Sequence, residues 1–238
     1  MQQRIKSFVL RAGRISARQQ QGLTIWLKDY QLAEPPTLWK LEQLFVRPAQ
    51  VVIEIGFGMG DSLLTMAAVN QQLNYIGIEV HRAGIGSLAA ALHERDINNL
   101  KIAPYDAVDV LQNCVEDDSI VGIQIFFPDP WPKLRHHKRR LISTDFIHMI
   151  ANKLKIGGFI HCATDCYDYA KHIHKILSLE PLVQNQELND NFTPRPPTRP
   201  LTKFEQKADK LGCNVWDLIF IRKSDELSYN ITLDKIIQ

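Results

Sequence analysis

The sequence lacks the features that mark several classes of protein. No uninterrupted apolar run approaches the roughly 20 residues of a transmembrane helix, and no long apolar segment of the secretory type opens the chain. None of the four cysteines stands in a C-x-x-C pair, which favours reduced thiols over a disulfide framework. Repeats and low-complexity segments are absent. We therefore expect a cytoplasmic globular protein with no membrane segment.

The sequence also lacks metal ligands at the spacing of a metal site, and its net charge is small. His161, Cys162 and Cys166 follow an apolar strand without a second ligand pair, so no metal site is predicted. The net charge of the 238 residues is only +2, and its distribution is more informative than its total. Residues 1–22 carry five basic residues and no acidic one, which predicts a basic arm that can hold a polyanion.

The stretch VVIEIGFGMG, Val51 to Gly60, organises the rest of the chain. A short apolar run rich in β-branched residues and closed by glycine is typical of a central parallel strand. Gly56, Gly58 and Gly60 follow at alternating positions, and an apolar helical pattern follows them. Strand, glycine loop and helix together let the backbone approach a ligand at a helix N-terminus.

The ligand of this loop is indicated by one departure from the dinucleotide pattern. The third glycine of G-x-G-x-x-G would fall at position 61, which is Asp61. A carboxylate there would repel a pyrophosphate, so a ligand with a positive centre and no phosphate, such as S-adenosylmethionine, fits better. Glu79 ends the next strand and suits a bidentate hydrogen bond to two ribose hydroxyls. The alternative is a tight structural turn without a ligand.

Strands and helices alternate from Val51 onward, which predicts an α/β fold with a doubly wound, mostly parallel sheet. Late strands over residues 182–188 and 215–221, joined by a long connection, predict an antiparallel hairpin at the edge. We divide the chain into a basic, mobile N-terminal arm (1–36) and a single domain (37–238) that is large enough to bury its own core. Helices are predicted over residues 37–46, 61–69, 107–113, 143–154, with Ser143 as N-cap, and 167–179, and a strand is predicted over residues 159–163.

Acidic residues stand at five successive strand ends. In an open α/β sheet the ligand binds beyond the carboxyl ends of the strands, so these side chains should line one crevice. Any one of them could instead cap a helix or lie in solvent, and this alternative is strongest for Asp106 and Asp165. The five are Glu54, Glu79, Asp106, Asp129 and Asp165.

Two loops indicate a nucleic acid as partner. The loop PDPWPKLRHHKRRL holds five Lys or Arg and two His between Lys133 and Arg140, with no acidic residue. Basic charge beside Trp131 at the mouth of a site suits RNA, since phosphates bind arginine and bases stack on rings. The segment over residues 192–208, FTPRPPTRPLTKFEQKA, is a long, proline-stiffened loop with further positive charge. The plain alternative for both is a solvated surface.

The motifs EIGFGMG, IGIEVH, FFPDPWPKxRHxKRR, TRPLTKFE and VWDLIF resemble those of the tRNA (guanine-N7-)-methyltransferase family. The resemblance covers roughly residues 38–222, and PDPW and RPLTKFE are its specific parts. It implies a class I, Rossmann-like methyltransferase fold, S-adenosylmethionine as methyl donor, and a guanine at position 46 of the tRNA variable loop as target. Pro132 and His137 depart from the common pattern, which frequently has His and Asn there.

The resemblance also assigns roles to residues. Asp129 corresponds to the proposed catalytic residue. The donor-binding positions are Glu54, Gly56, Gly58, Gly60, Glu79, Asp106 and Asp129. The substrate-binding positions are Lys133, Asp165, Thr202, Lys203, Phe204 and Glu205. The RNA-contacting stretch is Arg135, His136, His137, Lys138, Arg139 and Arg140. No obligate protein partner is evident.

Three other classes of protein compete with this interpretation. A small-molecule methyltransferase has no evident use for two long basic loops. A non-catalytic RNA-binding subunit would not need the full set of strand-end acids. A dehydrogenase is disfavoured by Asp61, which stands where its fingerprint requires glycine.

Overall fold

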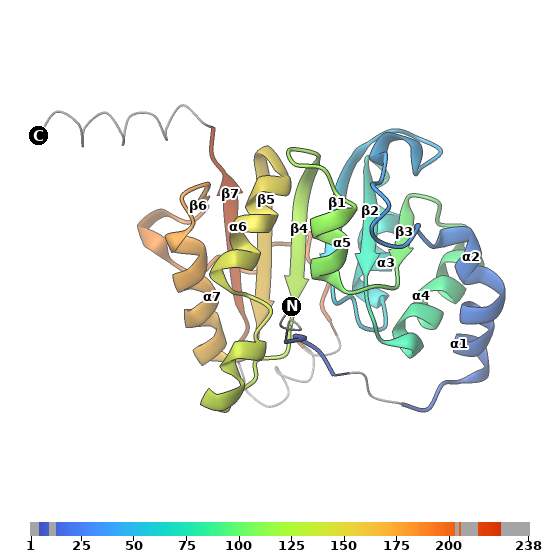
Figure 1. Cartoon of the computed structure of the whole chain (residues 1–238), viewed down its shortest axis with the longest axis horizontal. Coiled ribbons are helices and arrows are strands. Elements are labelled where there is room, and N and C mark those ends of the chain that lie inside the picture. Colours follow the sequence, from blue (N-terminus) through green and yellow to red (C-terminus); the bar gives the residue numbers. More distant parts are fainter. Residues whose placement is uncertain (1–4, 10–12, 203–204, 206–213, 225–238) are drawn as a thin grey trace, which may run out of the picture.

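The computed structural model describes residues 5–9, 13–202, 205 and 214–224. Its centre is a seven-stranded sheet in the order β3-β2-β1-β4-β5-β7-β6 (Figure 1). The strands are β1 (Gln50–Ile55), β2 (Leu73–Ile78), β3 (Leu100–Ala103), β4 (Ile120–Phe126), β5 (Leu154–Thr164), β6 (Val183–Asn185) and β7 (Trp216–Arg222). Strands β1 to β5 run parallel, whereas β7 lies antiparallel between β5 and β6. The predicted mostly parallel sheet with an antiparallel edge is confirmed.

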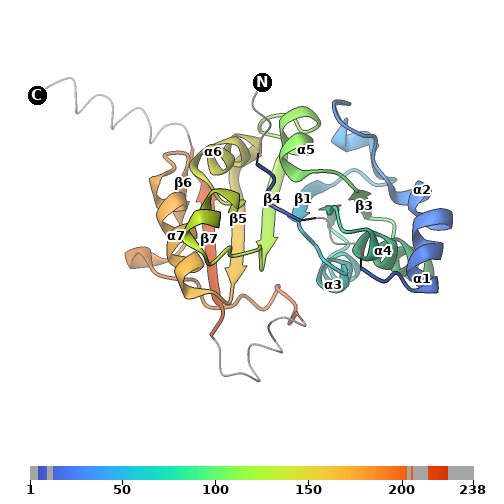
Figure 2. The same ribbon diagram turned by 60° about the horizontal axis from the view of Figure 1, so that its bottom comes forward.

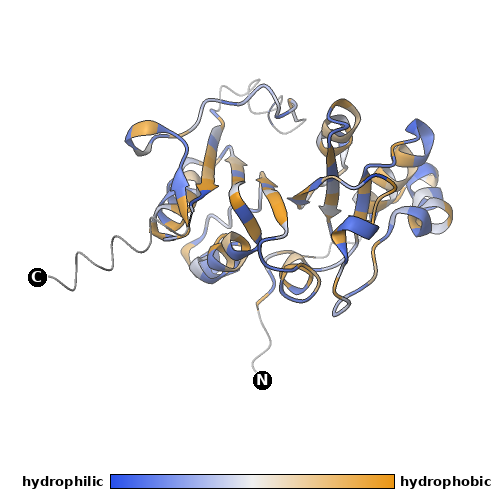
Figure 3. Ribbon diagram, turned by 90° about the horizontal axis from the view of Figure 1, so that it is seen from above, coloured by the Kyte–Doolittle hydropathy of each residue, from blue (hydrophilic) through white to orange (hydrophobic). Residues whose placement is uncertain are grey.

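Two groups of helices cover opposite faces of the sheet (Figures 1 and 2). On one face lie α3 (Asp61–Val69) and α4 (Arg82–Arg95), and on the other α5 (Ala107–Asn113), α6 (Thr144–Lys153) and α7 (Tyr167–Leu179). Because both faces are covered, β1 is buried from Val51 to Ile55 and reads as a continuous apolar run, interrupted by Glu54. Hydrophobic residues are concentrated along the strands and the helix sides that face them (Figure 3).

Local chemistry explains where the helices begin. The Ser143 hydroxyl accepts a hydrogen bond from the amide of Phe146 and starts α6, as predicted for an N-cap. Asp106 caps α5 in the same way through Val108. Gly60 precedes α3 at a φ of 84°, a left-handed conformation in which a side chain would be strained.

The helix predicted over residues 37–46 is wrong except for a single 3-10 turn, η2 (Leu41–Gln43). Tertiary hydrogen bonds take the backbone and side chain of Trp39 instead. Its amide donates to the carbonyl of Cys114 at 2.8 Å, and its indole N–H donates to the carbonyl of Ala33 at 3.0 Å. These bonds hold the segment against the end of α5 in a non-helical path.

Part of the predicted N-terminal arm is helical. Residues 17–30 form α1 (Ala17–Gln21), the π-helical turn η1 (Gly22–Trp26) and α2 (Leu27–Tyr30). Ser16 and Gln19 form a reciprocal capping box that starts α1. That residues 1–36 are a separate and mobile unit stays a prediction.

This helical segment packs on α4 with the two backbones in direct contact. A Cβ on Gly22 would overlap the carbonyl oxygen of Gly86, and one on Gly86 would overlap that of Gln19. On the other side of α4, a Cβ on Gly84 would overlap the carbonyl oxygen of Gly58. The N-terminal helices, α4 and the glycine loop are therefore stacked at distances that only glycine allows.

The remaining short elements are η3 (Leu134–Arg139) and η4 (Leu188–Asp190). Within the ranges that the structure describes, no helix has the length and apolar content needed to cross a membrane.

Candidate functional site

A cavity of about 230 Å³ lies beyond the carboxyl ends of β1, β2 and β4. A second cavity, of about 410 Å³, adjoins it and shares four lining residues with it: Phe8, Val80, Tyr105 and Asp106. The larger volume falls within the range of small-molecule pockets. Gly56, Glu79, Asp106 and Asp129 all line the first cavity, so four of the predicted donor-binding residues are brought together.

Glu79 ties the glycine loop to the end of β2. One carboxylate oxygen accepts a hydrogen bond from the amide of Gly58 at 2.9 Å, and the other accepts from the amides of Val80 and His81. These bonds fix the carboxylate at the cavity wall while leaving part of its acceptor capacity unused. Gly58 is thus bonded to a cavity-lining residue and Gly60 begins α3, and the donor-binding roles of both glycines stay predictions.

Glu54 differs from Glu79, Asp106 and Asp129, because neither it nor Asp165 is among the described residues that line the two cavities. Its side chain is 2% exposed, and Oε2 has no hydrogen-bond partner among the described residues. Burial, reinforced by the charge of Glu79, raises the pKa of Glu54 to about 8. The donor-binding role of Glu54 stays a prediction, and the structure puts the residue inside the sheet beneath the loop.

We expect Glu54 to make the stability of the ligand-free protein fall as the pH rises. Its pKa is above the ordinary value of 4.5, so between pH 4.5 and about 8 the folded state binds more protons than the unfolded state. The stabilisation is complete below this window and is lost towards pH 8. Glu54→Gln, which stays neutral, should therefore have a Tm that exceeds the wild-type value increasingly from pH 5 to pH 8. Parallel Tm profiles for the two proteins would contradict the expectation.

Asp106 has two roles in the structure. One oxygen accepts from the amide of Val108 and caps α5, which was the structural alternative for this residue. The side chain also lines both cavities, so the cap and the predicted donor contact are compatible.

Asp129 is exposed at the rim of the first cavity, directly after β4. The chain turns sharply there, because Phe127 and Trp131 have φ values of 52° and 44°. A bulky residue in the left-handed region costs on the order of 1–3 kcal/mol, and such residues cluster at functional sites. The strained turn carries Asp129 between them.

The basic loop after Asp129 folds around Trp131. The indole N–H donates to the carbonyl of Ser7 at 3.2 Å, the ring stacks with His136, and the Arg139 guanidinium lies 5.1 Å from the ring centroid. The positions from Lys133 to Arg139 are exposed or partly exposed, as an RNA-contacting stretch requires.

Arg140 is the exception in this stretch, because it is buried. Its guanidinium donates to the carbonyl of Pro130 at 2.9 Å and to Asp168 at 2.7 Å, and it lies over the ring of Tyr169. The hydrogen bond from Arg140 lowers the pKa of Asp168. The structure thus gives Arg140 the task of fixing the loop, and its predicted RNA contact is untested.

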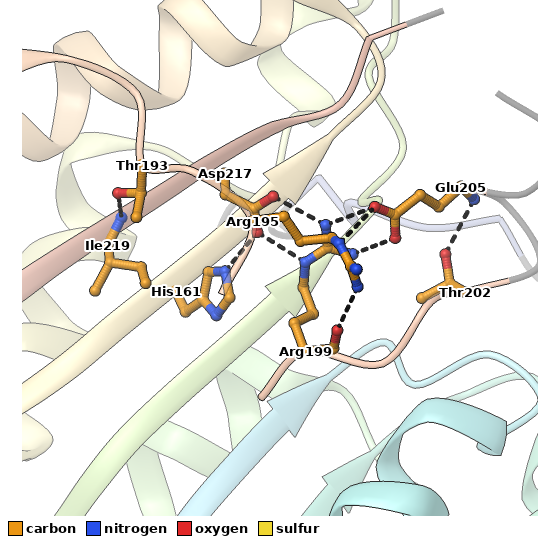
Figure 4. Close-up of polar contacts among 8 residues, drawn as sticks. All are labelled: His161, Thr193, Arg195, Arg199, Thr202, Glu205, Asp217 and Ile219. Atoms are coloured by element: carbon orange, nitrogen blue, oxygen red, sulfur yellow. Dashed lines mark hydrogen bonds and ion pairs between the residues drawn. The ribbon is translucent and has the colours of Figure 1, made fainter. Parts of the chain in front are cut away.

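Four of the six predicted substrate-binding residues lie within the described part of the chain. Asp165 is exposed after β5, and Lys133 is exposed at the start of η3. The Thr202 hydroxyl accepts from the amide of Glu205 at 3.1 Å, so these two are held together (Figure 4). Lys203 and Phe204 lie outside the described residues.

Sequence reasoning missed two features of the site. Ser7 and Phe8 of the N-terminal segment line the first cavity, and nothing in their composition indicates this. Arg199, Asp217 and His161 form a buried polar network with Glu205 (Figure 4). The available signal was a polar side chain within each apolar strand segment, His161 in FIHCAT and Asp217 in VWDLIF.

Within the described part of the chain, no group of three His, Cys, Asp or Glu is arranged to hold a metal ion. Cys114, Cys162 and Cys166 are free thiols, and burial raises the pKa of the first two.

The sheet order, the glycine loop and the acids at the strand ends define a class I methyltransferase. The fold is shared with the antibiotic-resistance methyltransferase Kmr, whose crystal structure matches with a TM-score of 0.50 at 11% identity, over 74% of this chain and 88% of that one. A family model described as "Putative methyltransferase" matches residues 48–218.

Curated relatives narrow the class to one family. A tRNA (guanine-N(7)-)-methyltransferase from Legionella pneumophila (strain Corby) is 57% identical, covering 94% of this chain and all of the relative. One from Yersinia enterocolitica serotype O:8 / biotype 1B is 47% identical, covering 92% of both chains. The chain belongs to the tRNA (guanine-N(7)-)-methyltransferase family.

Proposed function

We propose that this protein transfers the methyl group of S-adenosylmethionine to N7 of a guanine in tRNA, at position 46 of the variable loop. The observation that carries the proposal is the placement of Asp129. It stands on the rim of a cavity suited to the donor and opens a loop of positive charge suited to RNA. Membership of the family supports the same reaction.

The residues of the cavity fit S-adenosylmethionine. Glu79 presents a fixed carboxylate for the ribose hydroxyls, and apolar side chains of Ile78, Val80 and Phe126 can enclose an adenine. Glu79 and Asp129 place negative charge around the positive sulfonium, whereas a dinucleotide would bring further negative charge. When bound, S-adenosylmethionine supplies an already activated methyl group.

Glu79→Ala should weaken binding of S-adenosylmethionine about 10- to 100-fold, because hydrogen bonds to a charged acceptor are worth roughly 1.5–3 kcal/mol. Isothermal titration of the donor into the RNA-free protein measures the change. Glu79→Gln keeps the shape of the side chain and removes its charge, so this variant should lose less affinity for S-adenosylmethionine than Glu79→Ala. An unchanged dissociation constant in the alanine variant would remove Glu79 from the donor site.

The protein's own part in the reaction is mainly positioning. Guanine N7 is a lone-pair nucleophile without a proton, so no general base is needed before attack. The site has to align N7 with the methyl carbon, and alignment alone lowers barriers greatly. Asp129 or Asp165 can accept hydrogen bonds from the guanine N1 and N2 groups and stabilise the positive charge that methylation leaves on the ring.

The basic loop fits the RNA part of the substrate. Lys133, Arg135 and Lys138 are exposed cations that can bind phosphates without reading sequence. The target base must leave its stack to reach Asp129, since the N7 edge has to meet the donor. The N-terminal arm is a further proposed RNA contact.

Methyl transfer from labelled S-adenosylmethionine to unmodified tRNA tests the proposal. The control is the same tRNA with the variable-loop guanine replaced by adenine. Incorporation that disappears in the control supports both reaction and position. Incorporation that persists moves the target base, and no incorporation into any RNA despite intact donor binding favours a small-molecule methyltransferase or a binding subunit.

We further propose that the protein works in the cytoplasm, where its tRNA substrate is found, without an obligate protein partner. These two points rest on the sequence and on the family, and no contact in the structure bears on them.

A further inference from the structure

The loop between β6 and β7 is anchored by charged side chains that are almost wholly buried (Figure 4). Arg199 and Asp217 are each 1% exposed, and Glu205 is 4% exposed. Arg199 and Glu205 belong to the loop, whereas Asp217 is on β7. Burying charges is costly unless they are paired and hydrogen-bonded, so the geometry of this cluster has to be precise.

A single guanidinium satisfies both carboxylates. Arg199 donates from Nε and Nη2 to the two oxygens of Asp217, at 2.8 and 2.9 Å. It donates from Nη1 and Nη2 to the two oxygens of Glu205, at 2.6 and 2.9 Å. Burial acts to lower the pKa of Arg199, but the two carboxylates outweigh this and raise it, so the residue stays charged. Both oxygens of Glu205 are therefore already engaged.

The cluster is joined to the middle of the sheet. His161 Nε2 on β5 lies 2.7 Å from the Asp217 carboxylate, and both are buried. Nearby, the amide of Thr193 donates to the carbonyl of Asp217, and the Thr193 hydroxyl accepts from the amide of Ile219. The loop is thus fastened to β7 at its start, through Thr193, and in its middle, through Arg199.

The cluster also touches the wall of the donor cavity. The Arg199 guanidinium lies 5.9 Å from the ring centroids of both Phe126 and Phe127. These two rings line the first cavity, and Asp129 follows two residues later. Cation–ring contacts at this range are attractive. The loop between β6 and β7 carries the predicted substrate-binding residues Thr202 and Glu205 and is called the substrate loop below. Arg199 thereby connects the substrate loop to the strained turn that presents Asp129.

We propose that Arg199 is the positioning residue of the substrate loop, and that Glu205 serves the reaction through Arg199 instead of binding the guanine itself. The inference rests on the proposed function for the identity of the reaction. It departs from the role that the resemblance gives Glu205, because this carboxylate is only 4% exposed, whereas the Glu79 carboxylate, whose oxygens are also engaged, lines the open cavity. Thr202 is held through the amide of Glu205, and its predicted substrate contact is unaffected by this proposal.

A double-mutant cycle tests this directly. Arg199→Gln, Glu205→Gln and the double variant are compared in kcat and KM for tRNA. A misplaced loop can lower the rate about 100-fold, so each single variant should lose about that much in kcat. Because the two residues act as one unit, the double variant should be no slower than the slower single variant. Losses that multiply in the double variant would mean that Glu205 acts independently, which overturns the proposal.

Three comparisons separate positioning from general damage. The dissociation constant of S-adenosylmethionine should stay within about threefold in all three variants, whereas a fold-wide defect would weaken it as well. Arg199→Lys keeps the charge but offers a single donor group, and should recover part of the lost kcat. Arg195→Gln is the control in the same loop. The Arg195 side chain is 43% exposed, and its Nε lies 3.7 Å from Glu205 Oε1, so this variant should affect KM more than kcat.

Amide hydrogen exchange makes the test independent of tRNA. The amides of Thr193 and Arg199 are hydrogen-bonded to the carbonyls of Asp217 and Pro196. In Arg199→Gln they should exchange at least about tenfold faster than in the wild type, with β1 unchanged. Unchanged exchange would overturn the positioning role even if tRNA were not the substrate, whereas a wild-type protein inactive on tRNA would overturn only the proposed function.

Discussion

Replacing Asp129 with asparagine is expected to lower kcat for tRNA methylation about 100-fold, while the dissociation constant of S-adenosylmethionine changes less than about fivefold. Asparagine keeps the shape of the side chain and one acceptor oxygen. It removes the negative charge that we propose stabilises the guanine as the ring becomes positive. Single-turnover methyl transfer at saturating donor measures the chemical step without product release.

The position of Asp129 explains why the loss should fall on the rate. The residue is exposed on the cavity rim, and the turn that carries it is fixed by Phe127 in a left-handed conformation. A charge held in place by strained backbone requires little reorganisation when the reaction occurs. Asp165→Asn is the matched comparison at the next strand end. Full activity in Asp129→Asn would exclude electrostatic assistance by this residue.

Gly84→Ala is expected to destabilise the protein by about 3 kcal/mol, or a fall in Tm of roughly 10 °C. Helix propensity alone predicts the opposite, since alanine favours a helix interior by about 1 kcal/mol over glycine. The reason is steric, because a Cβ on Gly84 would overlap the carbonyl oxygen of Gly58. Thermal unfolding of the ligand-free protein measures the effect.

The same substitution should also weaken donor binding about tenfold, because Gly58 donates to the carboxylate of Glu79. Ser87→Ala, one turn further along α4 and partly exposed, is the control and should change Tm by no more than about 2 °C. A stabilised Gly84→Ala variant would show that the loop moves aside at no cost.

The fold could be predicted closely where one physical signal decided the structure. The helices over Asp61–Val69, Ala107–Asn113 and Tyr167–Leu179 were predicted at their observed bounds, because each begins shortly after the end of a strand. The segment around Trp39 was mispredicted, since its hydrogen bonds go to residues far away in the sequence. β5 begins at Leu154, earlier than predicted, and its register with β4 shifts between Ile120 and Gly122.

The location of the candidate site could be predicted from the sequence, but the orientation and pairing of some of its side chains could not. The rule that parallel strands end at one edge was enough to bring Glu79, Asp106 and Asp129 together. It did not reveal that Glu54 points into the core. The direction of each side chain follows from its alternation along β1, and because β1 is apolar on both faces, the sequence does not show which face Glu54 belongs to. The pairing of His161 with Asp217 joins residues 56 apart, and a single sequence contains no signal for that distance.

The glycine contacts between α1, α4 and the glycine loop bear on where the chain can be shortened. A version trimmed to the region that matches the family model, from residue 48, would leave the α4 surface at Gly86 without its covering backbone. Bare helix backbone and the apolar side chains beside it would then face water, next to the glycine loop. We therefore expect a chain that begins at residue 48 to be less stable than one that keeps the segment from Ser16 to Trp26.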